Sequence, residues 1–340
     1  MAVLNLKDKS SELLELRMGG RSWGLATGLA PLDEIYSIKL GYPLFIAGSP
    51  HAGKTELTME VMLNCIMLHP EFYCFCYFGE GGEVEDVYAD LCHKLVGKPY
   101  KAGDCFAMSE SEKAYAEQII DKYVYLVDDE KDMTLDDFYK EAARVEKEKG
   151  IKFKCTVFDP FNDVVDGSKD FGGRDDKWLA YELKQVRRQS KKNNRVDILV
   201  THISDIAPQT VKGTNNRYIP VALASEWSGG RTWWRRAFVM LMVYRPPEWL
   251  EDENGKPYGK DITLVYVQKA KPKGVAKLGK CKLEWDWQKN KYYWMDNGQA
   301  QFAYDINQPK NEPKKLSPAV KEFDPEQFTT AKKEENEMPF

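Results

Sequence analysis

The sequence predicts an α/β fold in which a mostly parallel central sheet is flanked by helices. Seven short apolar runs are spaced along the chain: YPLFIAG, FYCFCYF, YVYLVDD, KCTVFDP, VDILVTH, FVMLMVY and ITLVYVQ. Helical stretches separate most of these runs, and strands that are apolar along their whole length are buried on both faces of a sheet. The last two runs lack a helical crossover, so we expect antiparallel hairpin strands at the C-terminal edge.

Composition narrows the classes of protein that remain. The 340 residues are 43% hydrophobic and 30% charged, which is typical of a soluble globular protein. A formal net charge of −4 argues against coating nucleic acid through bulk positive charge, so any such contact must be local. The seven cysteines form no CxxC pair, which indicates reduced thiols in a cytoplasmic protein. The sequence contains no run of about 18 apolar residues, so we expect neither secretion nor a membrane span.

Changes in composition divide the chain into three parts. Residues 1–22 hold a leucine-bearing segment before a glycine pair, and we expect a linker or docking helix there. Residues 23–304 contain all the predicted strands and form the folded domain. Residues 305–340 are rich in proline and charge, which predicts a disordered tail.

A glycine-rich stretch, GSPHAGKTE, follows the first apolar run and precedes a helical segment. It fits the pattern G-x-x-x-x-G-K-[ST] in the strand-to-helix setting that this pattern requires. Backbone N–H groups of such a loop and the positive end of the following helix surround phosphates. Lys54 is expected to reach the β- and γ-phosphate oxygens and Thr55 to ligate Mg²⁺. The alternative, a glycine turn with a chance Lys-Thr pair, explains neither the complete pattern nor its setting. The predicted nucleotide-binding residues are Gly48, Ser49, Pro50, His51, Ala52, Gly53, Lys54 and Thr55.

Three further strand ends carry residues suited to nucleotide hydrolysis. Asp159 ends the run KCTVFD, as in a Walker B strand whose carboxylate holds the magnesium shell; capping of the strand end is the alternative. Glu80 follows FYCFCYF and is the predicted base that polarises the attacking water, although Glu83 and Glu85 lie near enough to compete. His202 ends VDILVTH and is the predicted sensor of the γ-phosphate, with a structural histidine as the alternative.

These motifs, in this order, resemble the RecA-like motor domain of hexameric replicative helicases of the DnaB type, in the variety found in phage primase-helicases and Twinkle. The resemblance extends over residues 23–294 and includes the stretches FGEGGEVEDVYADLCHKLVGKPY and EWSGGRTWWRRAFVMLMVYR. It implies a RecA-like P-loop NTPase that hydrolyses ATP with Mg²⁺ between the subunits of a ring. A hexamer acting on single-stranded DNA in replication is therefore expected, in the cytoplasm and with a phage origin.

The resemblance also implies catalytic residues donated by a neighbouring subunit, from a late strand of K-x-R form. Lys269 and Lys271 occupy these places in VYVQKAKPKG. Lys271 departs from the arginine usual in the family, and an ammonium stabilises charge spread over several oxygens less well than a guanidinium. Glu226 stands near a position that is commonly basic in the family. Both departures bear on hydrolysis and unwinding rather than on ATP binding.

Two polar loops and one aromatic segment are the candidates for gripping DNA. The loops DVVDGSKDFGGRDD and SDIAPQTVKGTNNRYIP follow the strands that end in Asp159 and His202. Such loops suit the tracking of a sugar-phosphate backbone, and ordinary solvated loops are the alternative. The predicted DNA-binding residues are Lys169, Arg174, Lys212, Arg217 and Arg231.

The predicted function is that of an ATP-dependent helicase or translocase on single-stranded DNA. Two alternatives remain open: a RecA/RadA-like recombination ATPase that forms filaments on DNA, and a non-motor assembly protein that nucleotide switches between shapes. The chain end, KKEENEMPF, resembles the acidic tips through which single-stranded-DNA-binding proteins recruit partners. Replication proteins are therefore candidate partners of the tail, and a solvating role is the alternative.

Overall fold

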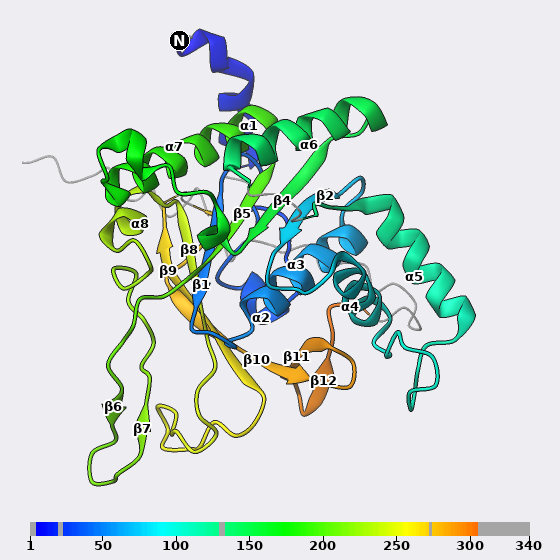
Figure 1. Cartoon of the computed structure of the whole chain (residues 1–340), viewed down its shortest axis with the longest axis vertical. Coiled ribbons are helices and arrows are strands. Elements are labelled where there is room, and N and C mark those ends of the chain that lie inside the picture. Colours follow the sequence, from blue (N-terminus) through cyan, green and yellow to red (C-terminus); the bar gives the residue numbers. More distant parts are fainter. Residues whose placement is uncertain (1–4, 20–22, 129–132, 272–273, 305–340) are drawn as a thin grey trace, which may run out of the picture. The chain divides into compact units, whose positions relative to one another are not determined.

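The computed structural model describes residues 5–19, 23–128, 133–271 and 274–304 (Figure 1). The predicted tail, 305–340, and its acidic end lie outside these ranges. None of the helices in the described ranges is long and apolar enough to cross a membrane.

A ten-stranded sheet forms the centre of the described domain, with strand order β12-β11-β10-β9-β8-β1-β5-β4-β2-β3. The pairs from β8 to β3 are parallel, and the pairs from β8 to β12 are antiparallel. Its strands are β1 (Leu44–Gly48), β2 (Tyr73–Phe78), β3 (Val124–Leu126), β4 (Phe153–Asp159), β5 (Val196–His202), β8 (Val239–Tyr244), β9 (Ile262–Ala270), β10 (Gly279–Asp286), β11 (Lys291–Asp296) and β12 (Gln299–Gln301). A separate two-stranded hairpin is formed by β6 (Gln209–Thr210) and β7 (Arg217–Tyr218).

Helices cover both faces of this sheet. The α-helices are α1 (Ser10–Gly19), α2 (Ala30–Asp33), α3 (Lys54–Leu68), α4 (Val84–Val96), α5 (Glu110–Tyr123), α6 (Leu135–Lys149), α7 (Asp175–Asn193) and α8 (Arg231–Arg236). Short 3₁₀ turns are η1 (Lys7–Lys9), η2 (Phe161–Asp163) and η3 (Ser168–Phe171). Ser109 and Thr134 begin α5 and α6 with reciprocal capping boxes, which satisfy N–H groups that the first turn leaves unpaired.

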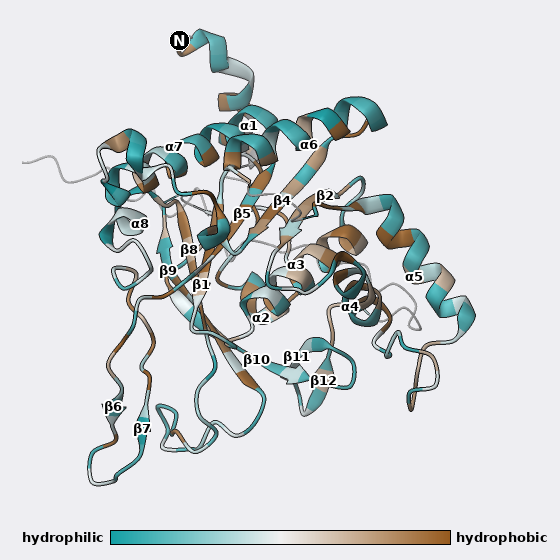
Figure 2. Cartoon of the chain, viewed as in Figure 1, coloured by the Kyte–Doolittle hydropathy of each residue, from teal (hydrophilic) through white to brown (hydrophobic). Residues whose placement is uncertain are grey.

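Alternation along the strands separates the core into two layers. In β1, Leu44 and Ile46 join a cluster with α3, α4 and α5, whereas Phe45 and Ala47 join a cluster with α6, α7 and α8. Successive side chains of a strand point to opposite faces, so a strand covered on both sides must be apolar throughout. Figure 2 shows this division, with apolar colour on the central strands and polar colour on much of the outer helices α6 and α7.

The predicted fold class is confirmed, with one correction to the edge of the sheet. The run FVMLMVY, expected in an antiparallel hairpin, forms β8, and β8 is parallel to β1 with Val239 opposite Leu44. The antiparallel part begins one strand later, where β9 pairs with β8. The chain reaches β8 from β5 through α8, and this helix of six residues is too short to produce a clear helical pattern in the sequence.

Candidate nucleotide-binding site

The glycine-rich loop joins the end of β1 to the first residue of α3. Gly53 caps α3 with φ +89°, a left-handed conformation that glycine adopts without strain. A Cβ atom on Gly48 would lie 2.5 Å from the carbonyl oxygen of Val243, so this glycine permits a close approach between β1 and β8. The loop therefore leads into a helix whose first N–H groups lack helical partners and suit an anion.

Lys54 and Thr55 begin α3 and face different partners. The buried Lys54 ammonium donates a hydrogen bond to the carbonyl oxygen of Ser49, 3.2 Å away in the same loop. Burial lowers the pKa of Lys54, and the neighbouring carboxylates of Asp159 and Glu80 act against that shift. The hydroxyl of Thr55 donates to Oδ2 of Asp159 at 2.7 Å. The two side chains thus sit where a phosphate oxygen and a metal ion would be held.

Asp159 ends β4 and is only 2% exposed. Among the described residues its Oδ1 atom has no hydrogen-bond partner. Burial raises the pKa of Asp159 to about 7, while the hydrogen bond from Thr55 and the charge of Lys54 oppose the shift. A buried carboxylate oxygen without a partner is costly. Mg²⁺ is typically bound through one or two carboxylates together with substrate phosphates, so Thr55 and Asp159 fit this ion.

Glu80 and His202 meet at the same edge of the sheet. Nε2 of His202 lies 3.1 Å from Oε1 of Glu80, and the glutamate side chain is 56% exposed. The charge of Glu80 also acts on Lys54 and Asp159, which means that its carboxylate lies within reach of the loop. The pair is therefore open to solvent on the side where a nucleophilic water would approach.

Strand register explains why residues so distant in sequence converge. In the parallel pairs, Gly48 lies opposite His202 and Phe78 lies opposite Asp159. The carboxyl ends of β1, β5, β4 and β2 consequently share one edge, which we call the phosphate edge. Ligands of open α/β sheets bind at this edge.

Lys269 and Lys271 lie toward the opposite edge of the sheet. Lys269 pairs with Met240, four residues before the end of β8, which is about 13 Å back from the phosphate edge. Its ammonium lies 4.9 Å from the ring centroid of Trp234, and burial together with Lys271 lowers its pKa to about 8. Lys271 donates to the carbonyl oxygen of Arg235 at 3.3 Å. Both side chains are therefore remote from the phosphate loop of their own chain.

The predicted DNA-binding residues are all exposed, in three separate segments. Lys212 and Arg217 belong to the β6–β7 hairpin, which projects away from the sheet in Figure 1. Lys169 lies in η3, and Arg174, just before α7, forms an ion pair of 2.8 Å with Asp176. Arg231 begins α8 and lines a surface pocket. The hairpin is thus the most prominent candidate for contact with a strand.

Three residues near the phosphate edge were not predicted from the sequence. Oδ1 of Asn162 accepts hydrogen bonds from Thr201 Oγ1 at 3.0 Å and from the His202 backbone N–H at 3.4 Å. Tyr292 of β11 donates to the carbonyl oxygen of Gly53 at 3.3 Å. Nη2 of Arg245 would lie 3.8 Å from a Cβ on Gly53. Asn162 lies three residues after Asp159, and this proximity is the one signal that the sequence offered.

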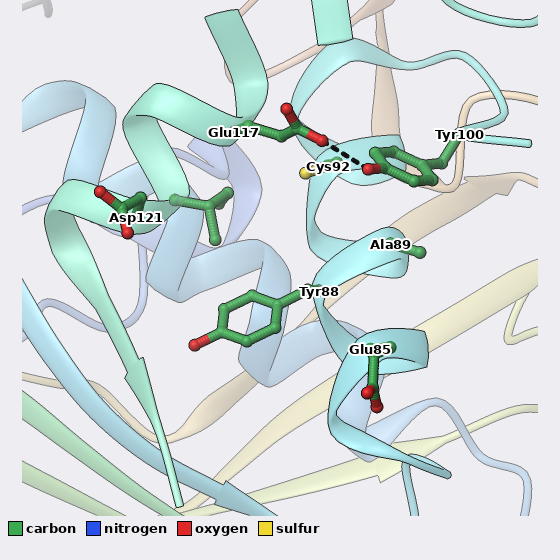
Figure 3. Close-up of a pocket in the computed structure, with 8 residues that line it drawn as sticks. Glu85, Tyr88, Ala89, Cys92, Tyr100, Glu117 and Asp121 are labelled. Carbon is green, nitrogen blue, oxygen red and sulfur yellow. Dashed lines mark hydrogen bonds between the residues drawn. The ribbon is translucent and has the colours of Figure 1, made fainter. Parts of the chain in front are cut away.

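A separate pocket of about 440 Å³ lies between α4 and α5 (Figure 3). It combines the rings of Tyr88 and Tyr100 with the carboxylates of Glu85, Glu117 and Asp121. Tyr100 donates a hydrogen bond to Glu117 across the pocket. None of these residues belongs to the phosphate edge.

Comparisons with known proteins agree with the predicted fold. No protein-family model matches the chain. The sequence is 24% identical over 276 residues to the Twinkle homolog protein, chloroplastic/mitochondrial, of Arabidopsis thaliana, a match that covers 79% of this chain and 36% of that protein. The solved ATPase domain of one DnaB-like helicase aligns with a TM-score of 0.65 at 14% identity, covering 86% of this chain and 99% of that one. A second DnaB-like replicative helicase, solved to show its interactions with primase, aligns with a TM-score of 0.62 at 14% identity, covering 86% and 67%.

The predicted resemblance to DnaB-type motor domains is confirmed by these comparisons. The chain has the RecA-like ATPase fold, and it spans 36% of the length of its curated relative. A RadB recombinase aligns with a TM-score of 0.45 at 15% identity over 76% of this chain, too distantly to bear on function.

Proposed function

We propose that this chain is an ATP-hydrolysing motor that translocates on single-stranded DNA and separates strands during replication. The observation that carries the proposal is the convergence of Lys54, Thr55, Asp159, Glu80 and His202 on one edge of the sheet. These residue types supply the positive charge, metal ligands, base and sensor that phosphoryl transfer to water requires.

Each side chain has a distinct part in the proposed reaction. Lys54 exchanges its bond to Ser49 for a phosphate oxygen and balances the negative charge there. Mg²⁺ held by Thr55 and Asp159 would neutralise charge on the phosphates. Glu80 accepts the proton of the attacking water, and it must first turn from His202 toward that water. His202 then remains as the group that distinguishes ATP from ADP.

The last wall of the site comes from a second copy of the chain. Lys269 and Lys271 lie toward the other edge of the sheet, so a head-to-tail neighbour is needed to bring them to the γ-phosphate. Such a heterologous contact closes into a ring when the rotation between subunits permits it. We propose a hexamer, as the likeness to DnaB-type domains implies.

The N-terminal helix is the segment proposed to link neighbours. Leu13, Leu14 and Leu16 of α1 are at least two-fifths exposed, which is unfavourable for a helix that remains in water. The pocket between α4 and α5 offers Ala89, Ile120 and the ring of Tyr88 as an apolar receptor (Figure 3). Docking of α1 into the pocket of the next copy would bury both surfaces.

DNA is proposed to pass along the β6–β7 hairpin and the segment that contains η3. Exposed Lys212 and Arg217 can neutralise backbone phosphates without reading the base sequence. Glu226, at a commonly basic place, accepts a hydrogen bond from the backbone N–H of Leu223 at 2.6 Å. This carboxylate therefore holds a turn, and we assign it no contact with DNA. Recruitment of replication proteins by residues 305–340, a cytoplasmic location and a phage origin stay predictions.

Hydrolysis assays with and without single-stranded DNA test the proposal, together with strand displacement on a forked duplex. We expect DNA to stimulate hydrolysis and forks to be unwound in an ATP-dependent way. The double variant Lys212→Ala/Arg217→Ala should lose the stimulation and keep basal hydrolysis, whereas Lys260→Ala, another exposed lysine, should behave as wild type. Hydrolysis that DNA leaves unchanged in an intact ring would favour the nucleotide-switched assembly protein. Open filaments on DNA in electron micrographs would favour the recombinase.

A further inference from the structure

A buried ion cluster lies against the helix that follows the phosphate loop. Lys94 of α4 is 0% exposed, and its ammonium lies 2.8 Å from Glu56 and 3.6 Å from Glu60, both on α3. The same ammonium donates to the carbonyl oxygen of Asn290 at 2.7 Å and lies 4.4 Å from the ring centroid of Trp285. One side chain thus joins α3, α4 and the β10–β11 hairpin.

Burial of these charges is costly, which makes a purely structural purpose a poor explanation. Glu60 is 1% exposed, and burial raises its pKa, with the charges of Lys94 and Lys291 opposing the shift. An apolar set of similar size is often as stable as a buried ion pair, because desolvation offsets the attraction. Ion pairs of this kind can instead select one arrangement of the elements that they join. Here the selected arrangement fixes where the β10–β11 hairpin stands against α3.

Tyr292 extends this hairpin contact to the phosphate loop. Its backbone N–H donates to Oε2 of Glu60 at 3.4 Å, and its ring packs edge-on against Trp285 with centroids 4.8 Å apart. Its hydroxyl donates to the carbonyl oxygen of Gly53 at 3.3 Å, and its side chain is fully buried. A Cβ on Gly53 would approach this hydroxyl to 2.5 Å, so the ring stands directly against the loop.

Peptide geometry gives this contact a consequence for phosphate binding. The carbonyl of Gly53 and the N–H of Lys54 belong to one planar trans peptide, so they point in opposite directions. The same carbonyl also accepts the N–H of Leu57 at 2.9 Å, the first hydrogen bond of α3. Holding the carbonyl on the Tyr292 side therefore aims the Lys54 N–H into the loop, where a phosphate oxygen would accept it.

We propose that Tyr292 is a positioning residue for nucleotide binding, held in place by the cluster of Lys94, Glu56 and Glu60. The proposal rests on the function proposed above, because it presupposes that the loop binds ATP. It adds a residue from a strand 239 positions away in sequence from Gly53. Tyr292 acts through the loop and touches no reacting atom.

The variant Tyr292→Phe removes the hydroxyl alone and tests the proposal. The affinities for ATP and ADP should weaken by the same factor, about two- to tenfold, which is the net worth of one hydrogen bond. KM for ATP should rise by that factor while kcat at saturating ATP stays unchanged, the signature of lost uniform binding. Tyr293→Phe is the matched control, since the hydroxyl of Tyr293 donates to Glu284 at 3.0 Å instead.

A second variant tests the cluster that holds Tyr292. Lys94→Met combined with Glu60→Gln removes both buried charges, so neither is left without a partner. We expect the same rise in KM, and a smaller than multiplicative effect when Tyr292→Phe is added, because both changes release one carbonyl.

The outcomes separate the two proposals. A wild-type chain that binds neither ATP nor ADP would overturn the proposed function. A wild-type chain that binds both, beside a folded Tyr292→Phe variant of equal affinity and equal KM, would overturn the role of Tyr292 alone. Equal weakening by Tyr293→Phe would also overturn it.

Discussion

The two edges of the sheet differ in how much of a hydrolytic site each one supplies. At the phosphate edge, Thr55 already bonds to Asp159, and Glu80 already meets His202 within one chain. Toward the opposite edge, Lys269 lies over Trp234 and Lys271 bonds to the carbonyl oxygen of Arg235, remote from the phosphate loop of the same chain. The difference teaches that one chain holds the groups that bind nucleotide, whereas its late-strand cations are placed to serve a neighbouring copy.

The strongest way to break this comparison is to remove the proposed base from the phosphate edge. Glu80→Gln should lower kcat by about 10²- to 10⁴-fold, because the amide cannot accept the proton of water. ATP binding, measured by equilibrium titration, should be preserved. Glu83→Gln is the matched control, since Glu83 is exposed at the start of α4 and makes no side-chain cap. Loss of turnover in Glu83→Gln with full turnover in Glu80→Gln would move the base to Glu83.

A smaller effect concerns the pH dependence of magnesium binding at the same edge. Burial raises the pKa of Asp159 from 3.8 to about 7, so the nucleotide-free folded chain holds a proton that the unfolded chain has released. The free energy of unfolding should therefore fall as pH rises between these values. Since only the carboxylate binds the ion, apparent Mg²⁺ affinity should weaken by about tenfold per unit below pH 7.

The variant Asp159→Asn separates this effect from protonation of the nucleotide. It should bind Mg²⁺ weakly at every pH, and without nucleotide it should unfold at a higher temperature than wild type at pH 8. Calorimetric titrations from pH 5.5 to 8 measure the affinities. An equal pH slope in both proteins would remove Asp159 as the group that titrates.

The smallest expected effect sharpens the description of the opposite edge. Lys271→Arg restores the guanidinium that the related domains use, and its planar fork contacts several oxygens at once. We expect kcat of the assembled protein to rise by about two- to tenfold, with no change in ATP affinity. A steady-state assay at saturating ATP measures the change, and an unchanged or lower kcat would mean that the ammonium is adapted to its place.

Sequence patterns predicted those parts of the molecule that depend on local signals. The apolar runs ending in Gly48, Asp159 and His202 form adjacent strands of one parallel sheet, because uniform apolarity reports burial on both faces. The direction of β8 was not predictable in this way, since an apolar run is the same in parallel and antiparallel pairs. Tyr292 was missed because its contact with Gly53 depends on how distant segments meet.

An equimolar mixture of Glu80→Gln and Lys271→Ala chains, assembled together, tests most directly whether each site is shared between two copies. Each chain alone should hydrolyse ATP poorly. In the mixture, about a quarter of the head-to-tail interfaces unite an intact Glu80 with an intact Lys271 of the neighbouring copy. The account predicts recovery of roughly a quarter of the wild-type rate. A mixture no more active than its two separate components would contradict it.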